Sequence, residues 1–340
     1  MKVLSLFDGI SCARVALDRL GYKDVEYYAS EVDKYAIQIS QRNYPDIVQL
    51  GSVVGLHFAQ TDVGLLIGGS PCQDLSIAKK DRKGLAGDRS GLFWEYVRIL
   101  KEVKPKYFIL ENVASMPKEA KALITETLGV ETVMLDAALV SAQRRKRLFW
   151  VGKWNGTKYE QVVIHQPKDR GILLKDILED GCAAKYNRID GLKEDIEKSQ
   201  ALCASDWRGI NRNQDQTAVY QYRRTYWRET KGGKVPTLTA NMGTGGNNVP
   251  YVAEPVALRN RGEGKKPEYN GTGKANALTT VHTDSMVDMP PIRKLTVKEC
   301  ERLQSLPDGY CDGVVSNTQA YKALGNAFNV EVIKHILSFI

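Results

Sequence analysis

Short apolar runs and helical stretches alternate along the first half of this 340-residue chain. Apolar runs bounded by turn residues predict buried strands. We expect such strands at residues 3–7, 26–31, 63–67, 107–110, 130–135 and 148–151. Apolar residues at helical spacing predict helices between them, at residues 13–20, around 35–39 and at 92–100.

The repeated order of strand, helix and strand predicts an α/β fold, with a mostly parallel sheet covered by helices on both faces. Ligands of such sheets bind at the carboxyl ends of the strands. The polar residues that follow the predicted strands are Asp8 and Gly9, Glu31, Pro71 and Cys72, and Glu111 and Asn112. We therefore expect the functional site at this edge of the sheet.

The pattern changes after about residue 154. Residues 155–291 are polar, rich in glycine and irregular, with two Thr-rich stretches that begin at residues 235 and 276. This composition predicts a smaller, β-rich and irregular second domain. Helical spacing returns from residue 294, and so apolar a final helix needs a surface to pack on. We expect one domain from residues 1–154 and 293–340, and a second from residues 155–292.

The formal net charge of +8 fits a polyanionic partner, although many enzymes with other partners share such an excess. No apolar run reaches the roughly 18 residues of a membrane span, and the N-terminus lacks a signal-peptide pattern. The six cysteines form no C-x-x-C pair and the four histidines are scattered, so we expect no metal site. We expect reduced thiols, most of them in the core, and a cytoplasmic protein without a membrane partner.

Cys72 is the sharpest candidate for a nucleophile. It follows a predicted strand, two glycines and Pro71. The glycines allow a ligand close to the backbone, Pro71 restricts the backbone, and a thiolate is a strong nucleophile. The alternative is a buried structural cysteine, since free cysteines are usually buried. No histidine is near in sequence, so a Cys–His protease pair has no local support.

A carboxylate and a basic cluster accompany this cysteine. Glu111, beside Asn112, ends another strand, where a carboxylate can protonate or hydrogen-bond a ring nitrogen of a substrate. The cluster at residues 143–147 precedes an apolar strand, and in an extended segment Arg145 and Arg147 share one side. An arginine there can hold a base carbonyl or a phosphate. The alternatives are a surface glutamate at a strand end and a solvated basic turn.

A cofactor site is indicated by Phe7, Asp8 and Gly9, which lead from the first strand into a helix, and by Glu31 after the second strand. This arrangement is similar to the start of a nucleotide-binding βαβ unit, whose acidic residue binds ribose hydroxyls. The full G-x-G-x-x-G pattern is absent. The turn therefore favours a cofactor that carries an adenosine but no phosphates.

Two further basic regions have the composition of a nucleic-acid surface. A glycine-containing loop shortly after the cysteine carries Lys79, Lys80 and Arg82, which suggests a mobile loop that touches phosphates. A later stretch that interleaves arginines with Trp and Tyr carries Arg223 and Arg224. A plain exposed loop and aromatic core positions are the respective alternatives.

Together these segments resemble the cytosine-C5 DNA methyltransferases. Six of them match motifs of that family in the family's order: FDGISC (7–12), GGSPCQDLS (68–76), ENV (111–113), QRRKR (143–147), RKLTVKECERLQSLP (293–307) and ALGNAFNV (323–330). Six ordered motifs are a very specific signal and cover nearly the whole catalytic domain. SPCQDLS, RKGL, FDGI and ASEV are closest to the animal de novo branch, but no regulatory domains precede them, so we expect a compact bacterial or phage enzyme. The pair Gly51–Ser52 departs from the family, which commonly has Gly-Asp there to contact the adenine.

The resemblance implies a Rossmann-like, class I S-adenosylmethionine methyltransferase fold with a smaller target-recognition domain. It implies transfer of a methyl group from S-adenosylmethionine to carbon 5 of cytosine in a specific duplex DNA sequence, after base flipping. S-adenosylhomocysteine is then the product, and no metal takes part. In this mechanism Cys72 attacks carbon 6, Glu111 protonates or hydrogen-bonds ring nitrogen 3, and Arg145 holds the exocyclic oxygen.

The resemblance also assigns the remaining site residues by motif position. Pro71 and Asn112 complete the catalytic set. The implied cofactor-binding residues are Phe7, Asp8, Gly9, Ile10, Glu31, Val32, Ser52, Ser70, Asn326 and Ala327. The implied DNA contacts are Gln73, Lys79, Lys80, Arg82, Arg147, Arg223 and Arg224.

Two other functions remain open on the same scaffold. One family branch methylates tRNA, but the large region at residues 155–291 favours duplex DNA, because base reading in the major groove needs added recognition elements. A non-catalytic relative would usually lack the nucleophile or the glutamate, and both are present. We expect a monomer that acts on double-stranded DNA in the cytoplasm of a bacterium or of a phage-infected bacterial host. Its partner in restriction–modification would be a cognate restriction endonuclease.

Overall fold

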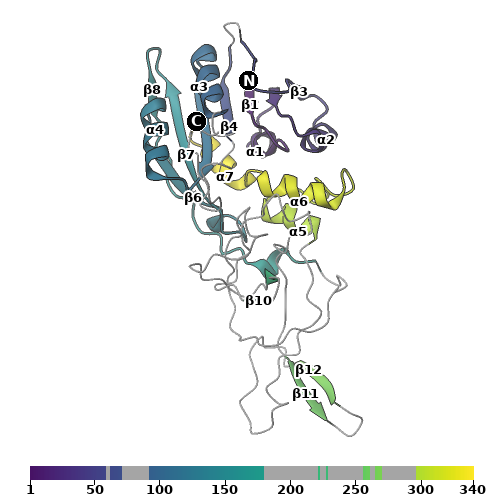
Figure 1. Ribbon diagram of the computed structural model, residues 1–340. Helices are drawn as coiled ribbons and strands as arrows, with labels where there is room; N and C mark the ends of the chain where they lie inside the picture. The colour runs from purple at the N-terminus through teal and green to yellow at the C-terminus, as the bar shows by residue number, and fades with distance from the viewer. Residues whose placement is uncertain are drawn as a thin grey trace.

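The computed structural model describes residues 1–58, 62–70, 92–179 and 296–340. Between the last two ranges it describes four strands: β9 (Gln221–Tyr222), β10 (Trp227–Arg228), β11 (Val256–Asn260) and β12 (Lys265–Tyr269). The described residues form an α/β body in which one large sheet has helices on both faces (Figure 1).

The large sheet has eight strands. They are β1 (Lys2–Leu6), β2 (Glu26–Ser30), β3 (Val48–Gln49), β4 (Leu65–Gly69), β5 (Tyr107–Val113), β6 (Thr132–Asp136), β7 (Lys146–Trp154) and β8 (Tyr159–Gln161). Their order is β3–β2–β1–β4–β5–β7–β6, with β8 paired to β7. Strands β1 to β5 are parallel, whereas β7 runs antiparallel to β5, β6 and β8. The predicted strands and the mostly parallel α/β fold are therefore confirmed.

Seven α-helices cover the sheet in the described part of the chain. They are α1 (Cys12–Arg19), α2 (Lys34–Asn43), α3 (Leu92–Val103), α4 (Lys118–Leu128), α5 (Val297–Leu303), α6 (Asn317–Asn326) and α7 (Val330–Leu337). One face packs α1, α2, α5, α6 and α7 against buried residues such as Ile67 and Ile109. The other face packs α3 and α4 against residues such as Leu66 and Phe108. Because side chains of a strand alternate between its two faces, neighbouring residues of β4 and β5 serve opposite layers.

Three details differ from the sequence predictions. The structure adds α4, β3 and β8, which the apolar pattern did not predict. Glu111 and Asn112 lie within β5, which continues to Val113, rather than after the strand. The strand at residues 148–151 is longer than predicted, and β7 runs antiparallel to β5, between β5 and β6.

Residues 155–179 pack on the same body as the strands before them. Tyr159–Gln161 pairs with β7, and Ile164 and Ile177 are buried in the same core cluster as residues of α1 and α7. Arg170 N also donates a hydrogen bond to Leu139 O. Within the described residues the first body thus continues to residue 179, beyond the expected boundary at residue 154, and the division into two domains stays a prediction.

The C-terminal helix packs back on the first half of the chain, as its apolar face predicts. Ile333, Ile336 and Leu337 of α7 are buried, and α7 lies against α1 (Figure 1). The strands of the second half pair as β9 with β10 and β11 with β12, both antiparallel. In the part of the chain that the structure describes, no helix has the length and apolar character to cross a membrane.

Candidate active site

The predicted site residues divide into those that the structure describes and those that it does not. Eight of them lie outside the described residues: Pro71, Cys72, Gln73, Lys79, Lys80, Arg82, Arg223 and Arg224. The others lie at or just after the carboxyl ends of β1, β2, β3, β4 and β5, at the start of β7 and at the junction of α6 and α7. The predicted edge of the sheet therefore gathers these residues.

The chain that leads to Cys72 approaches β5 through two glycines with no room for side chains. A Cβ on Gly68 would lie 2.9 Å from Leu6 O, and a Cβ on Gly69 would lie 2.9 Å from Phe328 Cε1 and 3.1 Å from Glu111 Oε2. Gly69 is the register partner of Glu111 in the β4–β5 ladder. This close approach brings the end of β4 directly beside the Glu111 carboxylate.

Ser70 and Asn112 fix the end of β4 on the other side. Ser70 is 4% exposed, and Asn112 Nδ2 donates a hydrogen bond to its Oγ at 3.2 Å. Asn112 Oδ1 in turn accepts a hydrogen bond from Val113 N at 2.8 Å. The Asn112 side chain thus joins two strand ends. Asn112 therefore fixes the position of Ser70, which is two residues before the predicted nucleophile in the sequence.

Glu111 forms an ion pair with Arg147. Arg147 Nε lies 2.8 Å from Glu111 Oε1, and the two side chains are only 18% and 12% exposed. In the β5–β7 ladder Arg147 stands opposite Val113, so it reaches Glu111 diagonally. Little water reaches the pair, so its charges are weakly screened. A carboxylate and a guanidinium side by side can bind the adjacent donor and acceptor groups of a planar ring.

Arg145 has a different environment from Arg147. It is 5% exposed, and its guanidinium donates hydrogen bonds to Gly325 O at 3.3 Å and Ala327 O at 2.9 Å. Arg147 alternates in β7 with Phe149 and Val151, which pack in the core with residues of α6 and α7, so it belongs to the same face of the sheet. Arg145 therefore holds the junction of α6 and α7 against the sheet, whereas Arg147 is the arginine beside Glu111.

The turn between β1 and α1 has an unusual backbone. Phe7, Gly9 and Ser11 have φ angles of +56°, +65° and +59°, in the left-handed region. Such a conformation costs on the order of 1–3 kcal/mol for a residue with a side chain, and it persists where the surrounding structure enforces it. A Cβ on Gly9 would meet no atom within 4 Å, so the turn leaves open space there.

Asp8 is a buried member of this turn. Its carboxylate accepts hydrogen bonds from Tyr27 OH at 2.7 Å and from Ser11 Oγ at 2.5 Å. Burial raises the pKa of Asp8, and the hydrogen bonds from Ser11 and Tyr27 offset only part of that rise. Ile10, also buried, accepts a hydrogen bond at its carbonyl from Tyr310 OH at 2.7 Å. Asp8 and Ile10 therefore stabilise the turn from the protein interior.

Glu31 is the acidic residue that faces the turn. Its carboxylate accepts hydrogen bonds from the backbone N–H groups of Gly9, Val32 and Asp33, at 2.8, 2.7 and 2.8 Å. Val32, 73% exposed, offers an apolar face beside it. Ser52 follows β3, and its Oγ accepts a hydrogen bond from Val54 N at 3.1 Å.

These residues fit an adenosine cofactor with a cationic group and do not fit a polyphosphate. Open space at Gly9, an exposed apolar Val32 and the Glu31 carboxylate form one neighbourhood. Carboxylates repel phosphates but bind hydroxyls and favour a sulfonium charge. Asn326, exposed at the end of α6, and the buried Ala327 follow on the helical side.

The structure adds residues to which the sequence interpretation gave no role. Phe328 packs against Gly69, and Gln143 is fully buried, with no partner among the described residues for its side-chain oxygen or nitrogen. Both lie in segments that resemble family motifs, which is the signal that could have found them. Three cysteines, Cys12, Cys300 and Cys311, are buried, and burial raises the pKa of each thiol, as expected of core cysteines.

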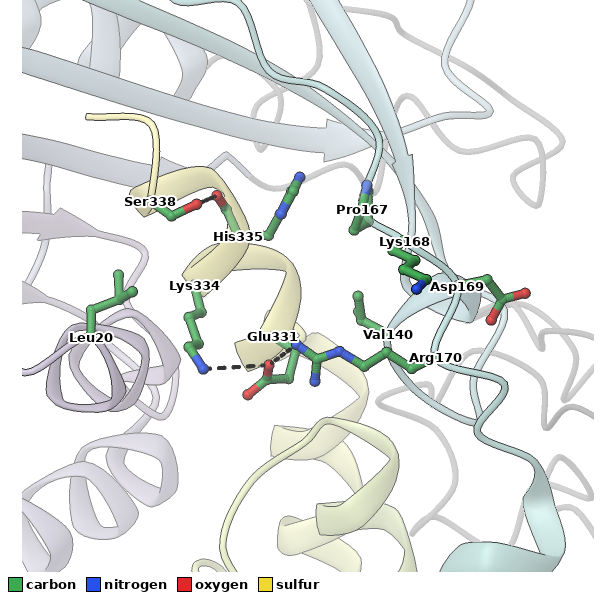
Figure 2. A pocket seen from close by; sticks show the side chains of 10 residues that line it. All are labelled: Leu20, Val140, Pro167, Lys168, Asp169, Arg170, Glu331, Lys334, His335 and Ser338. Carbon is green, nitrogen blue, oxygen red and sulfur yellow. Dashed lines mark hydrogen bonds and ion pairs between the residues drawn. The ribbon is translucent and has the colours of Figure 1, made fainter.

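A separate hollow of about 620 Å³ lies away from these residues, between α7, the end of α1 and the segment after β8 (Figure 2). Its lining includes Leu20 and Lys334 but none of the predicted site residues. Glu331 there binds Arg19 at 2.7 Å and Arg170 at 2.8 Å. Glu331 thus joins α1, α7 and the segment after β8 through ion pairs at this junction of packed elements.

Comparison with known proteins agrees with this geometry. The profile of the C-5 cytosine-specific DNA methylases matches residues 1–340. The Type II methyltransferase M.Bsp6I of Bacillus sp. (strain RFL6) is 28% identical, over 99% of this chain and 97% of its own. The orphan methyltransferase M.SPRI of Bacillus phage SPR is 26% identical, over 99% of this chain and 96% of its own.

Solved structures show the same fold at low sequence identity. The Entamoeba histolytica methyltransferase EhMeth superposes with a TM-score of 0.64 at 15% identity, over 100% of this chain and 97% of that chain. The S. pombe Dnmt2 methyltransferase gives 0.58 at 15% identity, over 99% and 97%. The family profile spans residues 1–340, and the sheet carries the predicted site residues at one edge. The chain belongs to the C-5 cytosine-specific DNA methylase family and is a DNA cytosine-5-methyltransferase.

Proposed function

We propose that this enzyme methylates carbon 5 of a cytosine flipped out of duplex DNA, through a covalent bond between Cys72 and carbon 6. The observation that carries the proposal is the Glu111–Arg147 pair beside Gly69, three residues before Cys72 in the chain. This pair supplies the groups that hold a pyrimidine ring where the predicted thiol can reach it.

Each residue has a role that follows from its charge and place. The Cys72 thiolate adds to carbon 6, which moves electron density toward carbon 5. Glu111 hydrogen-bonds or protonates ring nitrogen 3 and so stabilises that density. Arg147 donates to the exocyclic oxygen from the position next to Glu111. Carbon 5 then takes the methyl group that the cofactor would supply, with S-adenosylhomocysteine as the leaving group. Loss of the carbon-5 proton afterwards expels the thiolate and restores the ring.

We assign the role at the exocyclic oxygen to Arg147 rather than to Arg145. The Arg145 guanidinium already donates to two backbone carbonyls, of Gly325 and Ala327. Moving it to a substrate would leave those buried carbonyls unpaired, at a cost of about 1–3 kcal/mol each. Arg145 is then a support for the junction of α6 and α7.

The proposed cofactor is S-adenosylmethionine, which supplies an electrophilic methyl group on a positively charged sulfur. Glu31 would hold the ribose hydroxyls, and Val32 would cover the adenine, with Ser52 near its edge. The turn at Phe7, Asp8, Gly9 and Ile10, with Ser70, Asn326 and Ala327, would surround the rest. The fit of Glu31, Val32 and Gly9 to this molecule supports the assignment.

The proposed substrate is double-stranded DNA with a specific site. The excess of eight positive charges supports a polyanionic partner. The basic residues that we expect to contact DNA are the ones that the family resemblance implies. Relatives carry both Type II and orphan methyltransferase names, so a cognate restriction endonuclease and a bacterial or phage setting remain part of this proposal. A monomer is proposed with them.

Paired variants test the mechanism. Purified protein with labelled S-adenosylmethionine should methylate duplex DNA, and sequencing of bisulfite-treated DNA from expressing cells should locate the cytosine. Cys72→Ala should abolish transfer and Glu111→Gln should lower it strongly, with the fold intact by circular dichroism. Methylation at the wild-type rate in Cys72→Ala would refute the covalent route, and transfer to tRNA but not to duplex DNA would refute the substrate.

A further inference from the structure

Lys322 lies on α6, four residues before Asn326, and reaches the turn that follows β2. Its Nζ lies 2.6 Å from Asp33 Oδ2. Asp33 also begins α2, because its Oδ1 accepts a hydrogen bond from Tyr35 N at 3.0 Å. One carboxylate oxygen of Asp33 therefore caps the start of α2, and the other binds Lys322. This arrangement ties α6 to the first turn of α2, which it neighbours in Figure 1.

The same turn sets the direction of the Glu31 carboxylate. Asp33 N and Val32 N both donate hydrogen bonds to Glu31 Oε1, and Gly9 N donates to Oε2. A shift of the backbone at residues 32–33 would therefore turn the carboxylate. Because Lys322 holds the Asp33 side chain, two successive contacts connect α6 with Glu31.

The charges at the turn also depend on Lys322. Glu31 and Asp33 place two carboxylates two residues apart. Burial by itself would raise the pKa of Asp33, but the hydrogen bonds from Lys322 and the Tyr35 backbone outweigh it and hold the pKa below its usual value. Lys322 thus offsets the negative charge of Asp33, while the Glu31 carboxylate faces the turn at Gly9.

The neighbouring turn is supported from the same C-terminal segment. Tyr310 OH donates to Ile10 O, and Asn43 Nδ2 donates to Tyr310 O at 3.0 Å. Residues 296–340 therefore contact both turns of the cofactor site, one through Tyr310 and the other through Lys322.

We infer that Lys322 is a positioning residue for the cofactor, holding the Asp33 turn so that Glu31 faces the ribose hydroxyls. This inference rests on the proposed function, because it places the adenosine beside Glu31. The alternative is an ordinary surface ion pair. A pair whose side chains are 42% and 27% exposed contributes little to stability, so cofactor binding and stability separate the two explanations.

Calorimetric titration of S-adenosylhomocysteine into the DNA-free, full-length protein tests the inference. Lys322→Met keeps the length of the side chain and removes its charge, and Lys322→Arg keeps the charge. Lys2→Met is the matched control, because Lys2 is 41% exposed and pairs with Glu26 away from the turn. We expect Lys322→Met to weaken binding about tenfold, or about 1.4 kcal/mol, while Lys322→Arg recovers most of the affinity and Lys2→Met matches the wild type.

Kinetics and thermal unfolding complete the test. Lys322→Met should raise KM for S-adenosylmethionine and leave kcat at saturation and the melting temperature nearly unchanged. Wild-type affinity in Lys322→Met would overturn the inference, and so would a weakened affinity that Lys322→Arg does not recover. If the wild-type protein itself fails to bind S-adenosylhomocysteine, the proposed function is wrong, and the inference fails with it for that separate reason.

Discussion

Gly69 leaves no space for a side chain between Phe328 and Glu111, so an alanine there should displace the site. The new Cβ would lie 2.9 Å from Phe328 Cε1 and 3.1 Å from Glu111 Oε2. Carbon contacts are normally about 3.5–4.0 Å, so the ring and the carboxylate must shift by roughly 0.5–1 Å. Because a misplacement of about 1 Å can cost on the order of 100-fold in rate, we expect Gly69→Ala to lower kcat about 10- to 100-fold.

The same substitution at Gly64 is the control, because this glycine lies just before the same strand. A Cβ on Gly64 would lie 3.0 Å from Met1 Cγ, which is part of a flexible side chain, and 3.5 Å from Lys2 O. We expect Gly64→Ala to keep the wild-type kcat and to change the free energy of unfolding by less than about 1 kcal/mol. Gly69→Ala should lower it by about 1–3 kcal/mol, as overpacking does.

Steady-state methylation of a duplex oligonucleotide at saturating DNA and S-adenosylmethionine measures kcat, and urea unfolding measures the effect on stability. A loss of rate in Gly69→Ala under conditions where the protein is fully folded supports the geometry. Wild-type turnover in Gly69→Ala, or an equal loss in Gly64→Ala, would show that the close approach of β4 to Glu111 does not matter for catalysis.

Three other predictions follow from single contacts. Arg147→Met should lower kcat even where the variant is fully folded, and it should also destabilise the protein, because it leaves the largely buried Glu111 carboxylate without its partner. Arg145→Met should lower the free energy of unfolding by about 2–4 kcal/mol, because it leaves buried carbonyls unpaired. A wild-type kcat in folded Arg147→Met, or a wild-type urea midpoint in Arg145→Met, would contradict this. Lys298 holds the pKa of Glu179 below its usual value of 4.5, so Glu179 contributes stability above that pH and loses it as the pH falls through the folded value. Glu179→Gln should therefore lower the urea midpoint at pH 7, and its difference from the wild type should shrink as the pH falls below 4.5. A pH-independent difference would reject the ion pair as the cause. Ser52→Asp should tighten S-adenosylhomocysteine binding about fivefold, since a charged acceptor forms a stronger hydrogen bond, and unchanged calorimetric affinity would count against a place for Ser52 at the adenine.

The layout of the sheet could be predicted because its strands are continuous apolar runs. Each of the six predicted runs is a strand, and the polar residues after them, such as Glu31, lie at one edge. The pattern failed for α4, whose buried face is only Ala120, Ile124 and Leu128. One apolar residue per turn, four apart, is too narrow a stripe to stand out from a polar segment.

The direction of β7 and the partners of its arginines could not be predicted. Apolar alternation is the same for a parallel and an antiparallel strand, so residues 148–151 gave no direction. The sequence predicted that Arg145 and Arg147 share one side of the strand, but it did not predict that they have different partners. Those partners come from β5 and from the junction of α6 and α7, roughly 35 and 180 positions away in the chain.

The sequence by itself determined the α/β class, the edge of the sheet that holds the site and the residue types available there, because strand periodicity and turn chemistry are local properties of the chain. Only the tertiary structure decided that Arg147 faces Glu111, that Phe328 closes against Gly69 and that Lys322 reaches Asp33. Such contacts join segments that are far apart in sequence. Their geometry depends on how the layers pack, and no local pattern records it.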